Sequence, residues 1–176
     1  MKPKILALGN RYRQDDGVGP WVARHLREAG LEVFEVGDDL TRLLEGLAGA
    51  EEAWLLEAVR SGQPPGTLHV LEVGSAPLPA ALERLSSHAL SLAEALQLAR
   101  TLGWLPRRTL IYGIEGRRFG PGEELSPEVT RTAREVLKII KSQLASDAPS
   151  PGPCAGPLPG PGGGWRSPSE HARGHP

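Results

Sequence analysis

The stretch ILALGNRYRQDDGVGP, residues 5–20, decides the fold. An apolar run of strand length meets a Gly-Asn pair and crosses a polar loop, which ends in two adjacent carboxylates, Asp15 and Asp16, where a helical pattern begins. In an open α/β sheet, such a loop lies at the carboxyl end of its strand, where ligands bind. The stretch therefore predicts a strand, a loop and a helix start, with a ligand-binding position in the loop.

The composition of this loop restricts its ligand. A nucleotide site needs bare backbone amides or a cation for the phosphates, as in G-x-G-x-x-G or a loop that ends in Lys-Ser/Thr. Residues 9–17 contain neither pattern. Because the loop carries carboxylates instead, it suits a metal ion or a cationic group.

Length and charge exclude several classes of protein. With 176 residues, 39% of them hydrophobic, the chain has enough for one sizeable core and is short for two. A net charge of -1 argues against nucleic acid as a partner. The single cysteine, Cys154, excludes an intramolecular disulfide and a cysteine-rich metal site. The apolar run near the start is too short for a signal peptide or a membrane span, so we expect a cytoplasmic protein without membrane contact.

Periodicity along the chain predicts alternating strands and helices. We expect strands over residues 5–8, 31–36, 53–59, 67–73 and 109–114. We expect a helix from the acidic loop to residues 28–29, where Gly30 stops it, and a second over 40–47, which Asp38 or Asp39 can cap. Two more are expected from Ser91 to about Leu102 and from Ser126 to about Leu144. The order predicts a three-layer α/β/α sandwich with a mainly parallel, twisted, five-stranded sheet. The strand over 67–73 follows its predecessor through a loop too short for a crossover helix, which favours an antiparallel edge position.

The composition changes abruptly at the end of the chain. From about Ser146 the sequence consists mainly of Pro, Gly and Ser. Such a segment buries too little apolar surface to offset its ordering entropy. We therefore predict a folded domain over residues 1–145 and a disordered tail over residues 146–176.

Three side chains are the candidates for chemistry. Asp16 follows the first strand, Glu57 ends a central apolar strand, and His88 precedes a helix. Simple helix capping, without any chemical role, would explain one carboxylate of the pair Asp15 and Asp16. A lone histidine such as His88 is more often an ordinary surface or capping residue than a metal ligand. Glu57 is the sharper signal, because a carboxylate in a buried strand costs desolvation energy unless it meets a cation. Together the three form a plausible ligand set for nickel or zinc.

Several ordered motifs resemble a known family. The pattern ILALGNxxxxDDGVGPxVA is similar to the N-terminal signature of the hydrogenase maturation endopeptidases, which trim the C-terminal extension of the nickel-iron hydrogenase large subunit. The resemblance continues through nearly all of the folded part. Its further motifs are LLEAV at residues 55–59, PGT at 65–67, SHxLxLAEAL at 87–96, YGIE at 112–115 and GxxLSPxV at 122–129.

The resemblance implies a function and a site. Asp16, Glu57 and His88 fall on the three metal-recognising residues of the family, so they are the expected catalytic and metal-binding residues of an aspartic or metal-dependent endopeptidase. The metal is the nickel already inserted in the large-subunit precursor, or another divalent metal such as zinc in its place. Glu57 stands where the family commonly has Asp, and its extra methylene moves the carboxylate by roughly 1.5 Å. Residues 37–39 read Gly-Asp-Asp, where many members have a Gly-Thr element.

Two other classes compete with the protease. A non-catalytic module that senses a metal or a cationic peptide would use the same three residues without cleavage. A generic nucleotide-binding α/β protein would need a phosphate loop, which residues 11–16 are not. An acyl-enzyme mechanism has no obvious nucleophile, since Cys154 lies in the tail and no serine has the flanking glycines of a nucleophile elbow.

Overall fold

A computed structural model of the chain describes residues 2–74, 76–84 and 92–146. Its strands are β1 (Lys4–Leu8), β2 (Phe34–Gly37), β3 (Glu52–Val59), β4 (Leu68–Gly74) and β5 (Arg108–Glu115). The α-helices are α1 (Val18–Glu28), α2 (Leu40–Leu47), α3 (Leu92–Thr101) and α4 (Pro127–Ala145). Two short 3-10 helices, η1 (Gln14–Gly17) and η2 (Ala80–Arg84), complete the described elements.

The described strands form one sheet in the order β2-β1-β3-β5-β4. β1 pairs in parallel with both β2 and β3, and β3 pairs in parallel with β5. β4 pairs antiparallel with β5 at the edge. The predicted mainly parallel sheet with an antiparallel edge strand is therefore confirmed.

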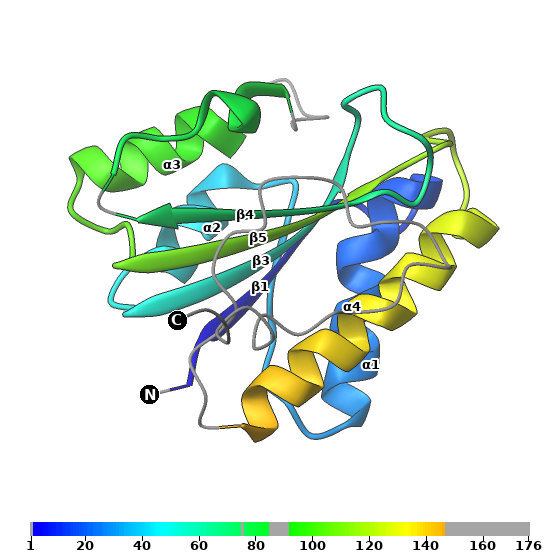
Figure 1. Cartoon of the computed structure of the whole chain (residues 1–176), viewed down its shortest axis with the longest axis horizontal. Helices are drawn as coiled ribbons and strands as arrows, with labels where there is room; N and C mark the ends of the chain where they lie inside the picture. Colours follow the sequence, from blue (N-terminus) through cyan, green and yellow to red (C-terminus); the bar gives the residue numbers. More distant parts are fainter. Residues whose placement is uncertain (1, 75, 85–91, 147–176) are drawn as a thin grey trace, which may run out of the picture.

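Helices cover both faces of the sheet, which gives the predicted three layers (Figure 1). Side chains of α1 and α4 pack on one face against apolar residues of β1, β3 and β5. Side chains of α2 and α3 pack on the opposite face. Because successive residues of a strand point to opposite faces, the central strand β3 supplies apolar side chains to both cores. Within β3, residues 53–59 are all buried, and only Glu57 among them is charged.

One element boundary and one capping explanation differ from what the sequence alone indicates. The second strand starts at Phe34 rather than residue 31, because the chain first completes the end of α1: Gly30 has a φ of +80°, and Leu31 N donates to Leu26 O at 3.0 Å. Helix capping, the simpler explanation of Asp15 or Asp16, does not apply at the start of α1. Both lie inside η1, and Gly17 at the N-cap of α1 has no side-chain cap bond.

Other predicted starts are confirmed with their chemistry. Asp39 is the N-cap of α2 and accepts a hydrogen bond from Thr41 N at 2.8 Å. Ser126 is the N-cap of α4, and Pro127 is the first residue of the helix. The Ser126 hydroxyl makes no cap bond to the helix and donates to Asp15 Oδ2 instead. The predicted cap Ser91 and the predicted tail beyond Ser146 lie outside the described residues, so both remain predictions. No helix within the described ranges combines the length and apolar character needed to cross a membrane.

Candidate functional site

The candidate site lies where β1 and β3 end side by side. The two strands are parallel neighbours, with Ala7 paired to Leu56, so the loop after β1 and the end of β3 meet at one edge of the sheet. Asp16 comes from that loop, and Glu57 follows Leu56 directly. The topology therefore brings together two of the three site residues that the sequence predicts.

Asp16 is held in place by its own loop. Its side chain is 1% exposed, and Asn10 N donates a hydrogen bond to Oδ2 at 3.0 Å. Gly9 permits this close packing, because its φ is +102° and a Cβ there would collide with the backbone oxygen of Asp16. The Gly-Asn pair of the sequence motif thus serves to position Asp16.

Glu57 is a buried carboxylate that lacks a full set of partners. The residue is 2% exposed, and Oε2 has no hydrogen-bond partner among the described residues. Burial raises the pKa of Glu57 from 4.5 to about 8, and the negative charge of Asp16 contributes to the rise. Leu55 and Val59 belong to the core beneath α2 and α3, so Glu57 points to that face of the sheet.

The pair is suited to a cation. A buried carboxyl group such as Glu57, whose pKa is raised by burial and by a neighbouring carboxylate, favours either a bound proton or a positive ion. Oxygen from Asp16 and Glu57 matches the preference of divalent metals when a further ligand is supplied. Among residues 2–74, 76–84 and 92–146, no three His, Cys, Asp or Glu side chains form a metal-binding group.

The third predicted ligand, His88, lies outside the described residues. Its role therefore remains a prediction. Leu92, four residues later, begins α3, which packs on the face toward which Glu57 points.

Asp15 has a structural role that differs from its neighbour's. Its Oδ2 accepts hydrogen bonds from the backbone nitrogens of Arg117 and Arg118, both at 2.8 Å, and from Ser126 Oγ at 2.8 Å. Its Oδ1 accepts a bond from Ser126 N at 2.6 Å. With four donors and no exposure, Asp15 ties the loop after β1 to the loop after β5.

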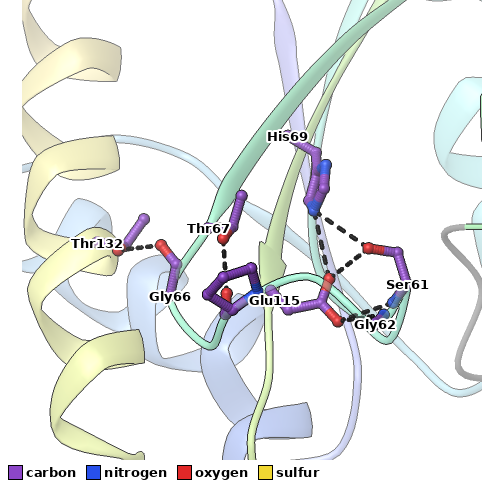
Figure 2. Close-up of polar contacts among 8 residues, drawn as sticks. Ser61, Gly62, Gly66, Thr67, His69, Glu115 and Thr132 are labelled. Carbon is purple, nitrogen blue, oxygen red and sulfur yellow. Dashed lines mark hydrogen bonds and ion pairs between the residues drawn. The ribbon is translucent and has the colours of Figure 1, made fainter. Parts of the chain in front are cut away.

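A second polar cluster lies close by at the end of β5 (Figure 2). The Glu115 carboxylate, 2% exposed, accepts hydrogen bonds from Ser61 N, Ser61 Oγ and Gly62 N at 2.8, 2.7 and 3.0 Å. His69 Nε2 is 3.3 Å from Glu115 Oε2 and 3.5 Å from Ser61 Oγ. Gly113 separates this cluster from Glu57, because it pairs with Glu57 on β3 and with His69 on β4.

This cluster is not a Ser-His-acid triad. In a triad the imidazole lies between the acid and the hydroxyl and uses one nitrogen for each. Here Ser61 Oγ donates directly to Glu115, and both approach the same nitrogen of His69. Glu115 was not predicted from the sequence as a buried acid, although the signal that selected Glu57, a carboxylate at the end of an apolar strand, applies to Glu115 as well.

Known proteins resemble this chain in sequence and fold. The sequence model of the hydrogenase maturation protease family, HycI, matches residues 21–143. Hydrogenase 2 maturation protease from Escherichia coli is 23% identical over 150 residues, which cover 82% of this chain and 91% of that protein. The hydrogenase expression/formation protein HupD from Thiocapsa roseopersicina is 24% identical over 147 residues, which cover 80% of this chain and 66% of HupD.

Solved structures give the same result. The [NiFe] hydrogenase maturation protease HybD from Thermococcus kodakarensis is 30% identical with a TM-score of 0.64, covering 82% of this chain and 99% of that one. The hydrogenase maturating endopeptidase HybD from E. coli has a TM-score of 0.68 at 21% identity, over 82% of this chain and 93% of that one. At 21% identity, the E. coli HybD structure shows that the fold is shared. Membership of the family is shown by the sequence model that matches residues 21–143.

Proposed function

The chain belongs to the hydrogenase maturation protease family, and from this membership we propose that it is an endopeptidase that removes the C-terminal extension of a nickel-iron hydrogenase large-subunit precursor. The names of its relatives support this assignment, since they include hydrogenase maturation proteases. The motifs around Asp16, Glu57 and Glu115 resemble the same family, so local sequence and overall fold agree.

The observation that carries the proposal is the buried pair of Asp16 and Glu57. A carboxylate oxygen that is buried without a partner costs roughly 1–3 kcal/mol or more, and Glu57 Oε2 is such an atom among the described residues. We propose that this oxygen meets the nickel of the precursor, together with Asp16 and His88. Zinc could replace nickel in a direct binding assay, because the same ligand types suit both ions.

The requirement of Asp16 and Glu57 for a cation would restrict cleavage to precursor that already contains nickel. In our proposal, the enzyme recognises nickel as part of its substrate, so a precursor without nickel lacks the cation that the two carboxylates require. The metal then positions the scissile segment at the edge of the sheet. An acyl-enzyme route is less compatible with the described residues, because the Ser61 hydroxyl near the site is bonded to Glu115.

The test compares precursor with and without nickel. Purified protein is incubated with a large-subunit precursor from the same organism, and mass spectrometry follows the loss of the C-terminal extension. We expect a shorter product only from the nickel-loaded precursor. Asp16→Asn should abolish cleavage while the melting temperature changes little, because the amide keeps the size of the side chain and can accept the bond from Asn10 N.

Asp38→Asn is the matched control, since Asp38 is an exposed carboxylate at the same edge of the sheet. It should cleave as the wild type does. Normal cleavage by Asp16→Asn would refute the role of the pair. Tight binding of nickel-loaded precursor without any product would favour the non-catalytic sensing module instead.

A further inference from the structure

Three loops join at the rim of the site. Gln14 N donates to Gly122 O at 2.7 Å and Gly122 N donates to Tyr12 O at 2.9 Å, which connects the loops after β1 and β5. Gly116 N donates to Val59 O at 3.0 Å, which connects the loop after β5 to the end of β3. In Figure 1 these loops gather at one end of the sheet, beside η1 and the start of α4. The three loops are therefore connected at this end of the sheet.

The three loops carry several arginines and aromatic residues, which we call the arginine patch. The guanidinium of Arg60 lies 4.2 Å from the centre of the Phe119 ring. Tyr12 is 63% exposed, the highest value among the large hydrophobic side chains of the described residues. The patch consists of Tyr12, Arg13, Arg60, Arg117, Arg118 and Phe119.

The positive charge of the patch is poorly matched within the protein. Arg117 pairs with Glu128 at 3.1 Å, whereas Arg118 bonds to the neutral Ser126 Oγ at 3.2 Å. Arg13 and Arg60 form no ion pair with any described residue. The acids two residues from Arg13 and Arg117 in the sequence, Asp15 and Glu115, are both buried and bonded to other donors. Since the whole chain has a net charge of -1, this excess is local.

Two acidic residues of the loop after β5 lie beside arginines outside the patch. Glu123 and Glu124 line a groove of about 440 Å³ with Arg11 and Arg24, at the start of α1. Arg11 also approaches Glu35, at 3.9 Å. None of the arginines of the patch lines this groove.

We propose that the arginine patch is a docking surface for an acidic segment of the precursor that the site cleaves. Exposed tyrosine and arginine are the side chains enriched at protein interfaces and at their energetic centres. Unmatched arginines at the edge of an interface accelerate association with an acidic partner and make it depend on salt. This inference rests on the proposed function, since the precursor is the partner that must reach Asp16 and Glu57.

The decisive variant is Arg13→Gln/Arg60→Gln. Gln keeps much of the length of each side chain and removes the charge. Exposed ion contacts are individually weak, so the loss of two of them should raise KM for nickel-loaded precursor about tenfold, while kcat stays within about twofold of the wild type. Raising the salt from about 50 to about 300 mM should increase the wild-type KM and change that of the variant much less.

The matched control is Arg131→Gln/Arg134→Gln, which removes two exposed charges from α4 away from the three loops. It should keep the wild-type KM and salt dependence. An unchanged KM for Arg13→Gln/Arg60→Gln, or an equal rise for the control, overturns the proposal. Competition by a single-stranded oligonucleotide, with none by poly-glutamate, would assign the patch to nucleic acid and overturn it too.

A binding measurement separates this inference from the proposed function. Asp16→Asn, with and without the two Gln substitutions, is titrated with nickel-loaded precursor at low salt. If the protein with the two Gln substitutions binds the precursor more weakly than Asp16→Asn alone, the patch is supported, even if the wild type cleaves nothing. Equal binding of the two proteins overturns the patch even if the wild type cleaves normally, and no binding by either overturns it as well.

Discussion

Replacing Glu57 by Gln should stabilise the protein at high pH. The pKa of Glu57 is raised from 4.5 to about 8, mainly by burial and further by Asp16. The folded protein therefore retains a proton on Glu57 that the unfolded chain releases above pH 4.5. Under the linkage relation, the stability associated with this group is fully present below about pH 4.5 and is lost as the pH rises to about 8.

The magnitude follows from the two pKa values. Their separation of about 3.5 pKa units, at about 1.4 kcal/mol per unit, corresponds to a loss on the order of 5 kcal/mol across this range. The amide of the Glu57→Gln variant carries no proton that titrates, so the variant should not suffer this loss. For a domain of this size, 1 kcal/mol corresponds to about 2–4 °C in melting temperature. The variant should therefore melt roughly 10–20 °C above the wild type at pH 8.5, relative to their difference at pH 4.5.

The assay is urea unfolding from pH 4.5 to 8.5 with a chelator present, followed by tryptophan fluorescence. Glu115→Gln is the control, because Glu115 is also buried at a strand end but accepts four hydrogen bonds. Its replacement should destabilise the protein at pH 8.5, by about 1.5–3 kcal/mol for weakened bonds to a charged acceptor. A difference between wild type and Glu57→Gln that stays constant across pH would refute the reasoning.

Three further outcomes can be measured. Asp15→Ala should lower the melting temperature by about 10 °C or more, because it leaves buried backbone donors of residues 117, 118 and 126 unpaired at about 1–3 kcal/mol each; a change below about 3 °C by calorimetry would contradict this. His88→Ala should keep the fold but lose affinity for nickel or zinc, along with the weakening of binding below about pH 6.5 that a histidine ligand causes; titration calorimetry with wild-type affinity would remove His88 from the site. Truncation after Ser146 should leave melting and precursor cleavage unchanged, and a large loss of either would show that residues 147–176 contribute to the domain.

The sequence predicted the layers of the fold because each rule it used was local. Apolar runs, the Gly30 stop and the Asp39 cap depend on neighbours within a few residues, and all are confirmed. The antiparallel edge strand was predicted from loop length alone. The strand order needed long-range pairing, which no local pattern contains, and the 3-10 turn at Gln14–Gly17 depends on bonds to a loop about 100 residues away.

The site was partly predictable for the same reason. Glu57 was recognisable because a charge in an apolar strand violates a local pattern, whereas the different tasks of Asp15 and Asp16 were not. Both are adjacent carboxylates in one loop, and only the tertiary structure shows that the first receives four donors while the second faces Glu57. A sequence pattern can thus indicate that a loop carries chemistry, but the partners across the fold decide which residue performs it.

The loss of stability that the buried Glu57 causes points to a functional role for this residue. A buried acid that destabilises the domain above its ordinary pKa is not needed for the fold, since a neutral side chain of the same size would fit the same place. A positive ion beside Asp16 and Glu57 would lower the pKa of Glu57 and reverse the loss. Without a cation in its site, the domain should therefore lose stability as the pH rises toward about 8, and in the proposed function it should gain stability when nickel-bearing precursor occupies the site. Under the proposed function, a protein that recognises a completed metal centre would retain this arrangement, because the metal-bearing substrate restores the free energy that the empty domain lacks.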